Sequence, residues 1–147
     1  MSKLQAPIVV GVDESDTARR AAFAAADLAV ALGAQLHLVM SVNRTRSSTS
    51  AGSSGDHFHI DWLSTAEQFL DALIGELPQS SAGRPTHSVG LDDPAKEICD
   101  AAARLDAGII VVGNRRVQGL SRVLGAVATD IARQAPCDVL IVNTIDA

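Results

Sequence analysis

Short β-branched runs alternate with helical patterns along the chain. Five runs predict strands, at residues 8–12, 36–42, 84–89, 109–112 and 138–143. The first and fourth runs lack polar alternation, which is typical of strands that are covered on both faces. The third run is polar and contains Pro85, so we expect this strand at an edge of the sheet.

Apolar residues at helical spacing predict four helices between these strands. The first spans residues 15–33, from a capping serine to a terminating glycine, and residues 60–77 form an amphipathic second helix. The third starts at Asp93-Pro94, a capping carboxylate followed by proline at the first helical position, and the fourth covers residues 125–134. This alternation indicates an α/β domain with a largely parallel sheet.

Length and composition fit a single domain over residues 1–147. With 47% hydrophobic residues, the chain is long enough to bury one sizeable core, and it needs no second one. A serine-rich stretch at about 43–58 holds almost nothing that can be buried, so we expect a flexible surface loop there. Regulatory phosphorylation of these serines is an alternative to a solvated spacer.

Charge and hydropathy argue against nucleic acids and membranes as binding partners of this chain. A net charge of −5 argues against binding to nucleic acid or to anionic membranes, although Arg115, Arg116 and Arg122 form a local basic cluster. No stretch approaches the roughly 20 apolar residues of a membrane span, and the N-terminus has no apolar signal core. Because Cys99 and Cys137 fit no disulfide or metal-ligand spacing, we expect packed thiols and a cytoplasmic protein.

The glycine-punctuated loop from Gly113 to Gly125 is the candidate site. A buried run leads into it and a helix follows it, and glycine lets a ligand approach the backbone where the helix start adds partial positive charge. Ligands of parallel sheets bind beyond the carboxyl ends of the strands, where Asp13, Ser41 and this loop would meet. A carboxylate beside an anion cradle suits a nucleotide, because the carboxylate accepts hydrogen bonds from base or ribose while the loop holds phosphate.

Some of these residues have simpler interpretations. Asp13 is also placed to cap the turn after its strand, and the two glycines of the loop also permit a turn and a helix start. His57 and His59 lie beside two aspartates but lack a third metal ligand at characteristic spacing, so they are interpreted as surface histidines. His37 is expected to pack on or near the sheet.

Enzymatic motifs are absent from the sequence. It contains no Ser-His-Asp, Cys-His or Walker-type motif. Asp92 and Asp93 have no partner nucleophile, so we expect them to cap their helix rather than to form an acid–base pair. We therefore expect a protein that is not an enzyme, while slow ATPase activity stays open with Asp13 as its one evident base.

The order and spacing of these segments resemble the universal stress protein family. The resemblance rests on residues 8–13, 38–42, 90–94, 109–113 and 137–142. It implies an open five-stranded parallel sheet of order 3-2-1-4-5 with helices on both faces, of the Rossmann-like adenine-nucleotide-binding type. It also implies a homodimer through the last strand, residues 138–143, and ATP, AMP or cyclic AMP as ligand, with or without Mg²⁺.

The candidate loop departs from the motif of the family's nucleotide-binding branch. That motif has glycine, two residues, glycine, nine residues, and then glycine followed by serine or threonine. Here Arg116 takes the place of the second glycine, the last spacer has eight residues, and Ala126 replaces the hydroxyl residue. Losing that hydroxyl costs about 1.5–3 kcal/mol, or roughly tenfold to a hundredfold in affinity. The forked cation of Arg116 is expected to hold phosphate directly.

The resemblance carries a set of nucleotide-binding residues onto this chain. They are Val12, Asp13, Ser41, Gly113, Arg115, Arg116, Gly119, Gly125, Ala126 and Val127. Asp13 is expected at the adenine or ribose end, the Ser41 backbone beside the base, and the amides near Gly125 at the phosphate. Two main functions remain open: a dimeric stress-response module that signals on binding an adenine nucleotide, and a degenerate pocket whose protein acts through dimerisation and protein partners.

Overall fold

The five expected strands form one parallel sheet. The computed structural model describes residues 3–42, 55–114 and 124–144, and the sheet in these ranges has the order β3-β2-β1-β4-β5. The strands are β1 (Ile8–Val12), β2 (Leu36–Ser41), β3 (Thr86–Gly90), β4 (Ile109–Gly113) and β5 (Asp138–Val142). All four pairings are parallel, which confirms the expected topology and brings the carboxyl ends of the strands to one edge.

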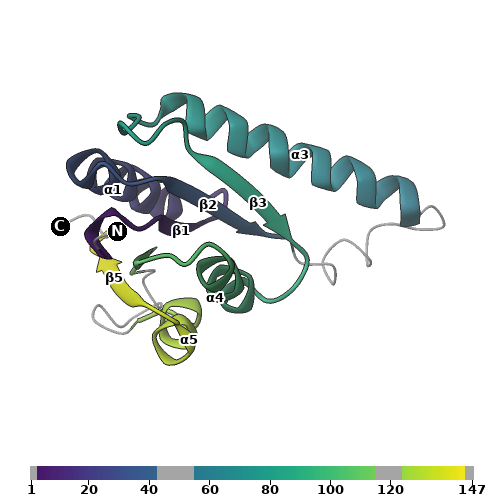
Figure 1. The fold of residues 1–147 in the computed structure, drawn as a ribbon. Coiled ribbons are helices and arrows are strands. Elements are labelled where there is room, and N and C mark those ends of the chain that lie inside the picture. Colours follow the sequence, from purple (N-terminus) through teal and green to yellow (C-terminus); the bar gives the residue numbers. More distant parts are fainter. Residues whose placement is uncertain (1–2, 43–54, 115–123, 145–147) are drawn as a thin grey trace.

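Helices cover both faces of this sheet. They are α1 (Asp16–Leu32), α3 (Gly55–Glu76), α4 (Pro94–Arg104) and α5 (Ala126–Gln134), preceded by a short 3-10 helix, η1 (Lys3–Gln5). Figure 1 shows α1 and α3 on one face and α4 and α5 on the other. In the described part of the chain, none of the helices combines the length and the apolar character that crossing a membrane requires.

Local capping groups set the ends of the helices. The Ala18 backbone N–H donates to Ser15 Oγ over 3.1 Å at the start of α1, and Gly33 ends this helix with a φ of 64°. Only a residue without a Cβ adopts that left-handed conformation at little cost. At the start of α4, the Lys96 backbone N–H donates to Asp93 over 3.3 Å. The caps predicted at Ser15, Gly33 and Asp93 are thereby confirmed.

Short side chains let the helices approach the sheet closely. The side of α1 that faces the sheet is built from alanines: Ala21, Ala22, Ala25, Ala26 and Ala29. On the opposite face, a Cβ added to Gly11 would collide with the Ile98 side chain of α4. This glycine near the end of β1 therefore sets how closely α4 packs on β1, the strand that leads into the candidate site.

Two elements start more than one residue away from the expected positions. β3 lies at an edge as predicted but starts at Thr86, because Pro85 has no backbone N–H to donate to a neighbouring strand. α3 starts at Gly55, so residues 55–58, expected in the flexible loop, are helical. Extending an existing helix costs far less than starting one, which explains the added turn. Residues 43–54 of that loop lie outside the described residues.

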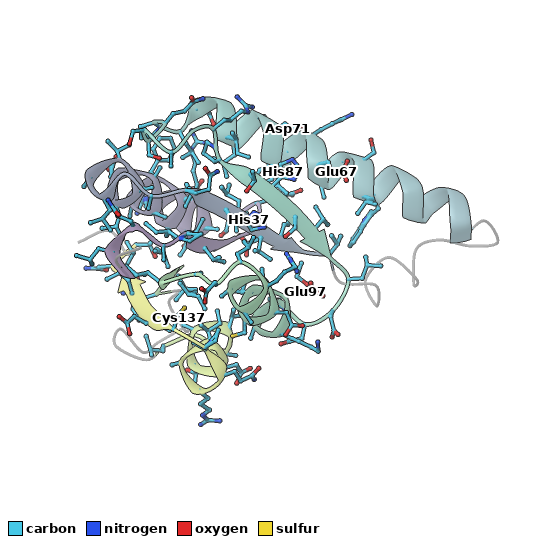
Figure 2. The ribbon with its side chains drawn as sticks, viewed as in Figure 1. His37, Glu67, Asp71, His87, Glu97 and Cys137 are labelled. Atoms are coloured by element: carbon cyan, nitrogen blue, oxygen red, sulfur yellow. The ribbon has the colours of Figure 1, made fainter. Side chains whose placement is uncertain are left out.

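His37 joins β2 to the edge strand. Its side chain is labelled in Figure 2. Its ring Nδ1 lies 2.7 Å from Thr86 Oγ1 and its Nε2 lies 2.9 Å from Ser88 Oγ, so both ring nitrogens are hydrogen-bonded. Burial lowers the pKa of His37 to about 4, with smaller contributions from Arg104 and His87. The imidazole is therefore neutral at neutral pH, and the expectation that it packs on the sheet is confirmed.

Candidate functional site

A cavity of about 890 Å³ opens at the carboxyl edge of the sheet. It lies at the ends of β1, β2 and β4, next to the N-terminus of α5, with walls from α1, α3 and α4. β1 is flanked by β2 on one side and by β4 on the other, so the strand order reverses at this point. This is the position at which open parallel sheets form their ligand crevice.

Most of the predicted site residues surround this one cavity. Seven of them line it: Val12, Asp13, Ser41, Gly113, Gly125, Ala126 and Val127. The other three, Arg115, Arg116 and Gly119, lie outside the described residues. The geometric condition of the hypothesis is met, since the carboxylate after β1 and the start of α5 share a cavity. Ligand binding by these residues stays a prediction.

Asp13 holds the turn after β1, as its simpler interpretation predicts, and it also lines the cavity. Its Oδ1 accepts a hydrogen bond from the Ser15 backbone N–H over 2.8 Å, which holds the turn between β1 and α1. A carboxylate has about four lone-pair positions, so this bond leaves capacity for a ligand. The side chain is exposed and lines the cavity. The turn thus orients the group that is expected to meet a base or a ribose.

Gly113 is required by packing rather than by an unusual backbone angle. A Cβ at this position would lie 3.0 Å from Thr144 Cγ2 and 3.1 Å from Thr17 Cγ2. Among the described glycines, the positive φ values belong to Gly33 and Gly83. The glycine at the end of β4 therefore lets α1 and the segment after β5 approach the cavity wall.

A hydrogen-bonded clamp behind Gly113 was not anticipated from the sequence. Asn114 Oδ1 accepts from the Thr144 backbone N–H over 2.7 Å and from Thr144 Oγ1 over 3.1 Å. The Arg20 guanidinium also donates to the Thr144 carbonyl over 2.9 Å. Thr144 is only 4% exposed. The clamp fixes the end of β4 to the chain after β5, and no sequence pattern links these distant residues.

The N-terminus of α5 forms the end of the cavity that suits an anion. Gly125 is the N-cap residue and makes no side-chain capping hydrogen bond, and Ala126 and Val127 follow it. The first backbone N–H groups of a helix have no intrahelical acceptor, and the helix dipole adds partial positive charge there. Because Gly125 has no side chain to cap them, these N–H groups can meet a phosphate.

Comparison with known proteins identifies the family. The model of the universal stress protein family matches residues 6–143. The chain belongs to this family. UspA from Lactobacillus plantarum, with 21% identity and a TM-score of 0.69 over 95% of this chain and 98% of that one, has the same fold. A comparison with curated proteins gives no match.

Two structures of universal stress proteins contain adenine nucleotides. One is a universal stress protein in complex with cAMP, 25% identical, with a TM-score of 0.64 over 96% of this chain and 98% of that one. The other is the universal stress protein from Archaeoglobus fulgidus in complex with dAMP, 26% identical, with a TM-score of 0.59 over 94% and 98%.

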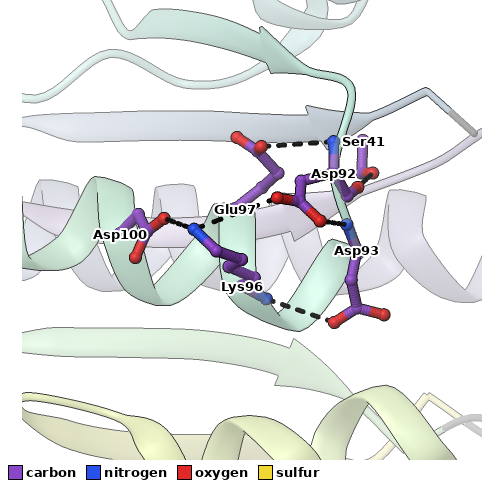
Figure 3. A network of polar contacts seen from close by, with 6 residues as sticks. All are labelled: Ser41, Asp92, Asp93, Lys96, Glu97 and Asp100. Atoms are coloured by element: carbon purple, nitrogen blue, oxygen red, sulfur yellow. Dashed lines mark hydrogen bonds and ion pairs between the residues drawn. The ribbon is translucent and has the colours of Figure 1, made fainter.

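In this universal stress protein, the Ser41 hydroxyl is engaged by the protein itself. Its Oγ donates to the Asp92 carbonyl oxygen, while Asp92 Oδ1 accepts from the Asp93 backbone N–H over 2.8 Å (Figure 3). Glu97 Oε1 also accepts from the Asp92 backbone N–H over 3.3 Å. The network ties the end of β2 to the start of α4. The Ser41 hydroxyl hydrogen is therefore used within the protein, while its oxygen keeps acceptor capacity for a ligand.

Sequence reasoning missed the apolar wall of the cavity. Trp62, Thr65 and Ala66 of α3 line it, together with Met40 and Val42 at the end of β2. The helical spacing of the apolar residues in α3 predicted only the inward face of an amphipathic helix, not the wall of a cavity. One signal was available, since Trp62 is the single tryptophan of a chain with 3% aromatic residues.

The charge of the cavity lining is negative. Of the described residues that line it, Asp13 and Glu14 carry carboxylates and none is lysine, arginine or histidine. Positive potential within the described lining comes from helix N-termini, those of α1 and α4 as well as that of α5.

Metal binding and thiol chemistry find little support in the described ranges. No group of three or more histidine, cysteine, aspartate or glutamate side chains there could hold a metal ion. The side chains of His57 and His59 lie outside the described ones. Cys99 is buried and Cys137 is half-buried in the cluster between the sheet and the α4 and α5 helices, so the expected packed thiols are confirmed.

Proposed function

We propose that this universal stress protein binds an adenine nucleotide in the cavity at the carboxyl edge of its sheet. One observation carries the proposal: the Asp13 carboxylate and the uncapped N-terminus of α5 line the same cavity. Its volume of about 890 Å³ lies in the usual range for small-molecule pockets. The relatives with bound cAMP and dAMP support an adenine nucleotide as the ligand class.

The proposed pose follows from the chemistry of the walls. Phosphate lies against the amides of Gly125, Ala126 and Val127, and the ribose lies near Gly113 and Asp13. AMP and cyclic AMP demand less positive charge than ATP, so they suit the described lining better. ATP binding would depend on Arg115 and Arg116, with Mg²⁺ carried on its phosphates.

We further propose that the protein acts as a homodimer through β5 and signals by binding rather than by turnover. β5 is an edge strand, and Leu140 on it is 43% exposed. An edge strand presents unpaired backbone groups that a second copy of the chain can meet. Ile141→Lys places a charge on this strand and is expected to shift the protein toward monomer in analytical ultracentrifugation. A dimer that survives the substitution would exclude this mode of association.

A degenerate pocket is the second candidate function. Ala126 at the first position of α5 has no hydroxyl for a phosphate, and the described lining has no cationic side chain. In this case dimerisation and protein partners carry the role. Thermal unfolding with ATP, AMP and cyclic AMP separates the two candidates, since a ligand that binds the native state raises Tm by mass action. No shift with any of the three favours the degenerate pocket.

Calorimetric titration of two cavity variants tests the proposed site. Asp13→Ala removes the carboxylate, and Gly125→Trp fills the phosphate end, so both are expected to weaken AMP binding at least tenfold. Asp27→Ala is the control for the first, because Asp27 is exposed on α1 away from the cavity. Gly75→Trp is the control for the second, since open space surrounds Gly75. Unchanged affinity in both cavity variants would place the ligand elsewhere.

ATP turnover is a separate question. Phosphate release measured at high protein concentration tests the slow ATPase hypothesis, and an Asp13→Asn variant shows whether release depends on that carboxylate. We expect no release above background, because the Asp13 carboxylate, which the sequence suggested as a base, is held by the turn.

A further inference from the structure

Trp62 occupies an unusual place for the single tryptophan of the chain. It lies in α3, whose N-terminal turns run past the end of β3 (Figure 1). Trp62, Thr65 and Ala66 line the cavity, and residues three and four positions apart share one face of a helix. The indole is half-buried, whereas Ala66, one turn further on, is 4% exposed.

The cavity has two chemically different ends. α5 packs on β5 and contributes backbone amides, whereas α3 packs on β3 and contributes an indole ring. Between them, the cavity edge runs from β2 across β1 to β4, which is two strand spacings or about 10 Å. Near Trp62 the wall is apolar, since the indole packs against the buried cluster that contains Met40 and Val42.

This polarity matches the polarity of a nucleotide. Its phosphate and its base lie on opposite sides of the ribose, and only the phosphate needs amides or cations. A flat, apolar base with a π-face gains most from an aromatic surface at the other end. If phosphate lies at α5, the base extends along the cavity toward β2 and α3.

We infer that Trp62 is a specificity-determining residue that recognises the nucleotide base by stacking its indole on the purine ring. The inference rests on the proposed nucleotide-binding function and adds to it a side chain that reads the base. Base recognition at this end is independent of the altered phosphate motif, because it does not involve Arg116 or Ala126. Purines are expected to bind better than pyrimidines, since a larger ring system stacks over more area.

Trp62→Ala, Trp62→Phe and Phe69→Ala form the test set. Phe69 is also a half-buried aromatic residue of α3 that packs on the same cluster, but it does not line the cavity. Phe69→Ala therefore reproduces the loss of packing without touching the ligand site. Thermal unfolding of each variant shows that it is folded, and Trp62→Phe keeps an aromatic face if the alanine variant fails to fold.

AMP and CMP are the probes, titrated calorimetrically into the protein of residues 1–147. Trp62→Ala is expected to weaken AMP binding roughly tenfold to a hundredfold and to reduce the preference for AMP over CMP. Trp62→Phe should retain most of the affinity, and Phe69→Ala should leave it unchanged. AMP should also quench the fluorescence of the wild type, which contains a single tryptophan.

The outcomes separate this inference from the proposed function. If the wild type binds no adenine nucleotide, the proposed function fails and the inference falls with it. If AMP binds, but Trp62→Ala binds it as tightly as the wild type and the base does not quench the indole, the inference alone is wrong. Equal weakening by Trp62→Ala and Phe69→Ala would also overturn it, because the effect would then come from packing.

Discussion

Polar groups in the amino-terminal half of the sheet are paired within the protein, whereas those at its carboxyl edge face a cavity. Near the start of β2, His37 is 6% exposed and each of its ring nitrogens meets a hydroxyl of β3. At the carboxyl edge, the Asp13 carboxylate and the first amides of α5 face a cavity. Buried polar groups are normally paired within a protein, so groups left open at a concave site are candidates for ligand contact.

This difference separates stability from binding. Changes in the amino-terminal half are expected to alter the free energy of unfolding and to leave ligand affinity alone. Changes at the carboxyl edge are expected to do the reverse, except where a residue there is also tightly packed. Three predictions test or refine this separation.

The largest effect is expected from protonation of His37. Its pKa is lowered to about 4 in the native state, whereas an unfolded histidine titrates near 6.5. The unfolded state therefore binds the extra proton first, so the stabilisation is complete above pH 6.5 and is lost as the pH falls toward 4. The expected loss is about 2–3 kcal/mol of unfolding free energy between these pH values.

Urea denaturation at pH 7, 5.5 and 4 measures this loss. Acidic groups also titrate in this range, so the wild type is compared with His37→Gln, which keeps an amide for Thr86 and Ser88 but does not titrate. The difference between the two curves should change with pH. Parallel curves would show that protonation of His37 does not destabilise the native state.

A smaller effect is expected at Gly113, which lines the cavity and is also tightly packed. A valine there would press on Thr144 and Thr17, and such overpacking typically costs about 1–3 kcal/mol. Gly75 in α3 is the matched control because a Cβ there meets nothing within 4 Å. Gly75→Ala should raise stability by about 0.5–1 kcal/mol, since alanine is the better helix former. If both substitutions changed the free energy of unfolding in the same direction, the packing role of Gly113 would be contradicted.

The smallest expected effect is that of Arg116. If its guanidinium replaces the missing phosphate contacts, Arg116→Ala should weaken ATP binding about tenfold while the unfolding free energy stays within about 0.5 kcal/mol. Arg116→Lys keeps the charge but not the forked geometry and should fall between the two. Calorimetry with ATP measures the change. Wild-type affinity in the alanine variant would mean that the α5 amides hold the phosphates without it.

Local sequence was sufficient for the elements and their order. Helix caps could be predicted at Ser15, Gly33 and Asp93, because a cap involves only backbone groups of residues nearby in the sequence. The alternation of strands and helices then limits how a parallel sheet can be wound. Asp13 and Gly125 could be placed at the site for the same reason, since each directly follows or precedes an element that ends at one edge of the sheet.

The start of α3 shows where local reasoning fails. The serine-rich stretch near residue 55 has few residues that favour a helix. The pattern of apolar residues also does not show how far a helix extends once it packs on the sheet. Contacts made by Leu70, Leu73 and Ile74 with the sheet stabilise α3, and the helix extends outward from them to Gly55. Trp62 already lies within the predicted helix, and the packing of α3 on the sheet places it beside the cavity.

The sequence by itself determined that strands alternate with helices, where the capped helix ends lie and at which edge a ligand would bind, because these follow from patterns within a few residues. The strand order was implied by the resemblance to the universal stress protein family rather than by any local pattern. The tertiary structure decided which distant side chains meet. It brought Thr144 to Asn114, Ile98 to Gly11, and Trp62 to the end of β2. Such contacts join residues separated by many positions in the chain, and only the packing of helices on the sheet makes them neighbours.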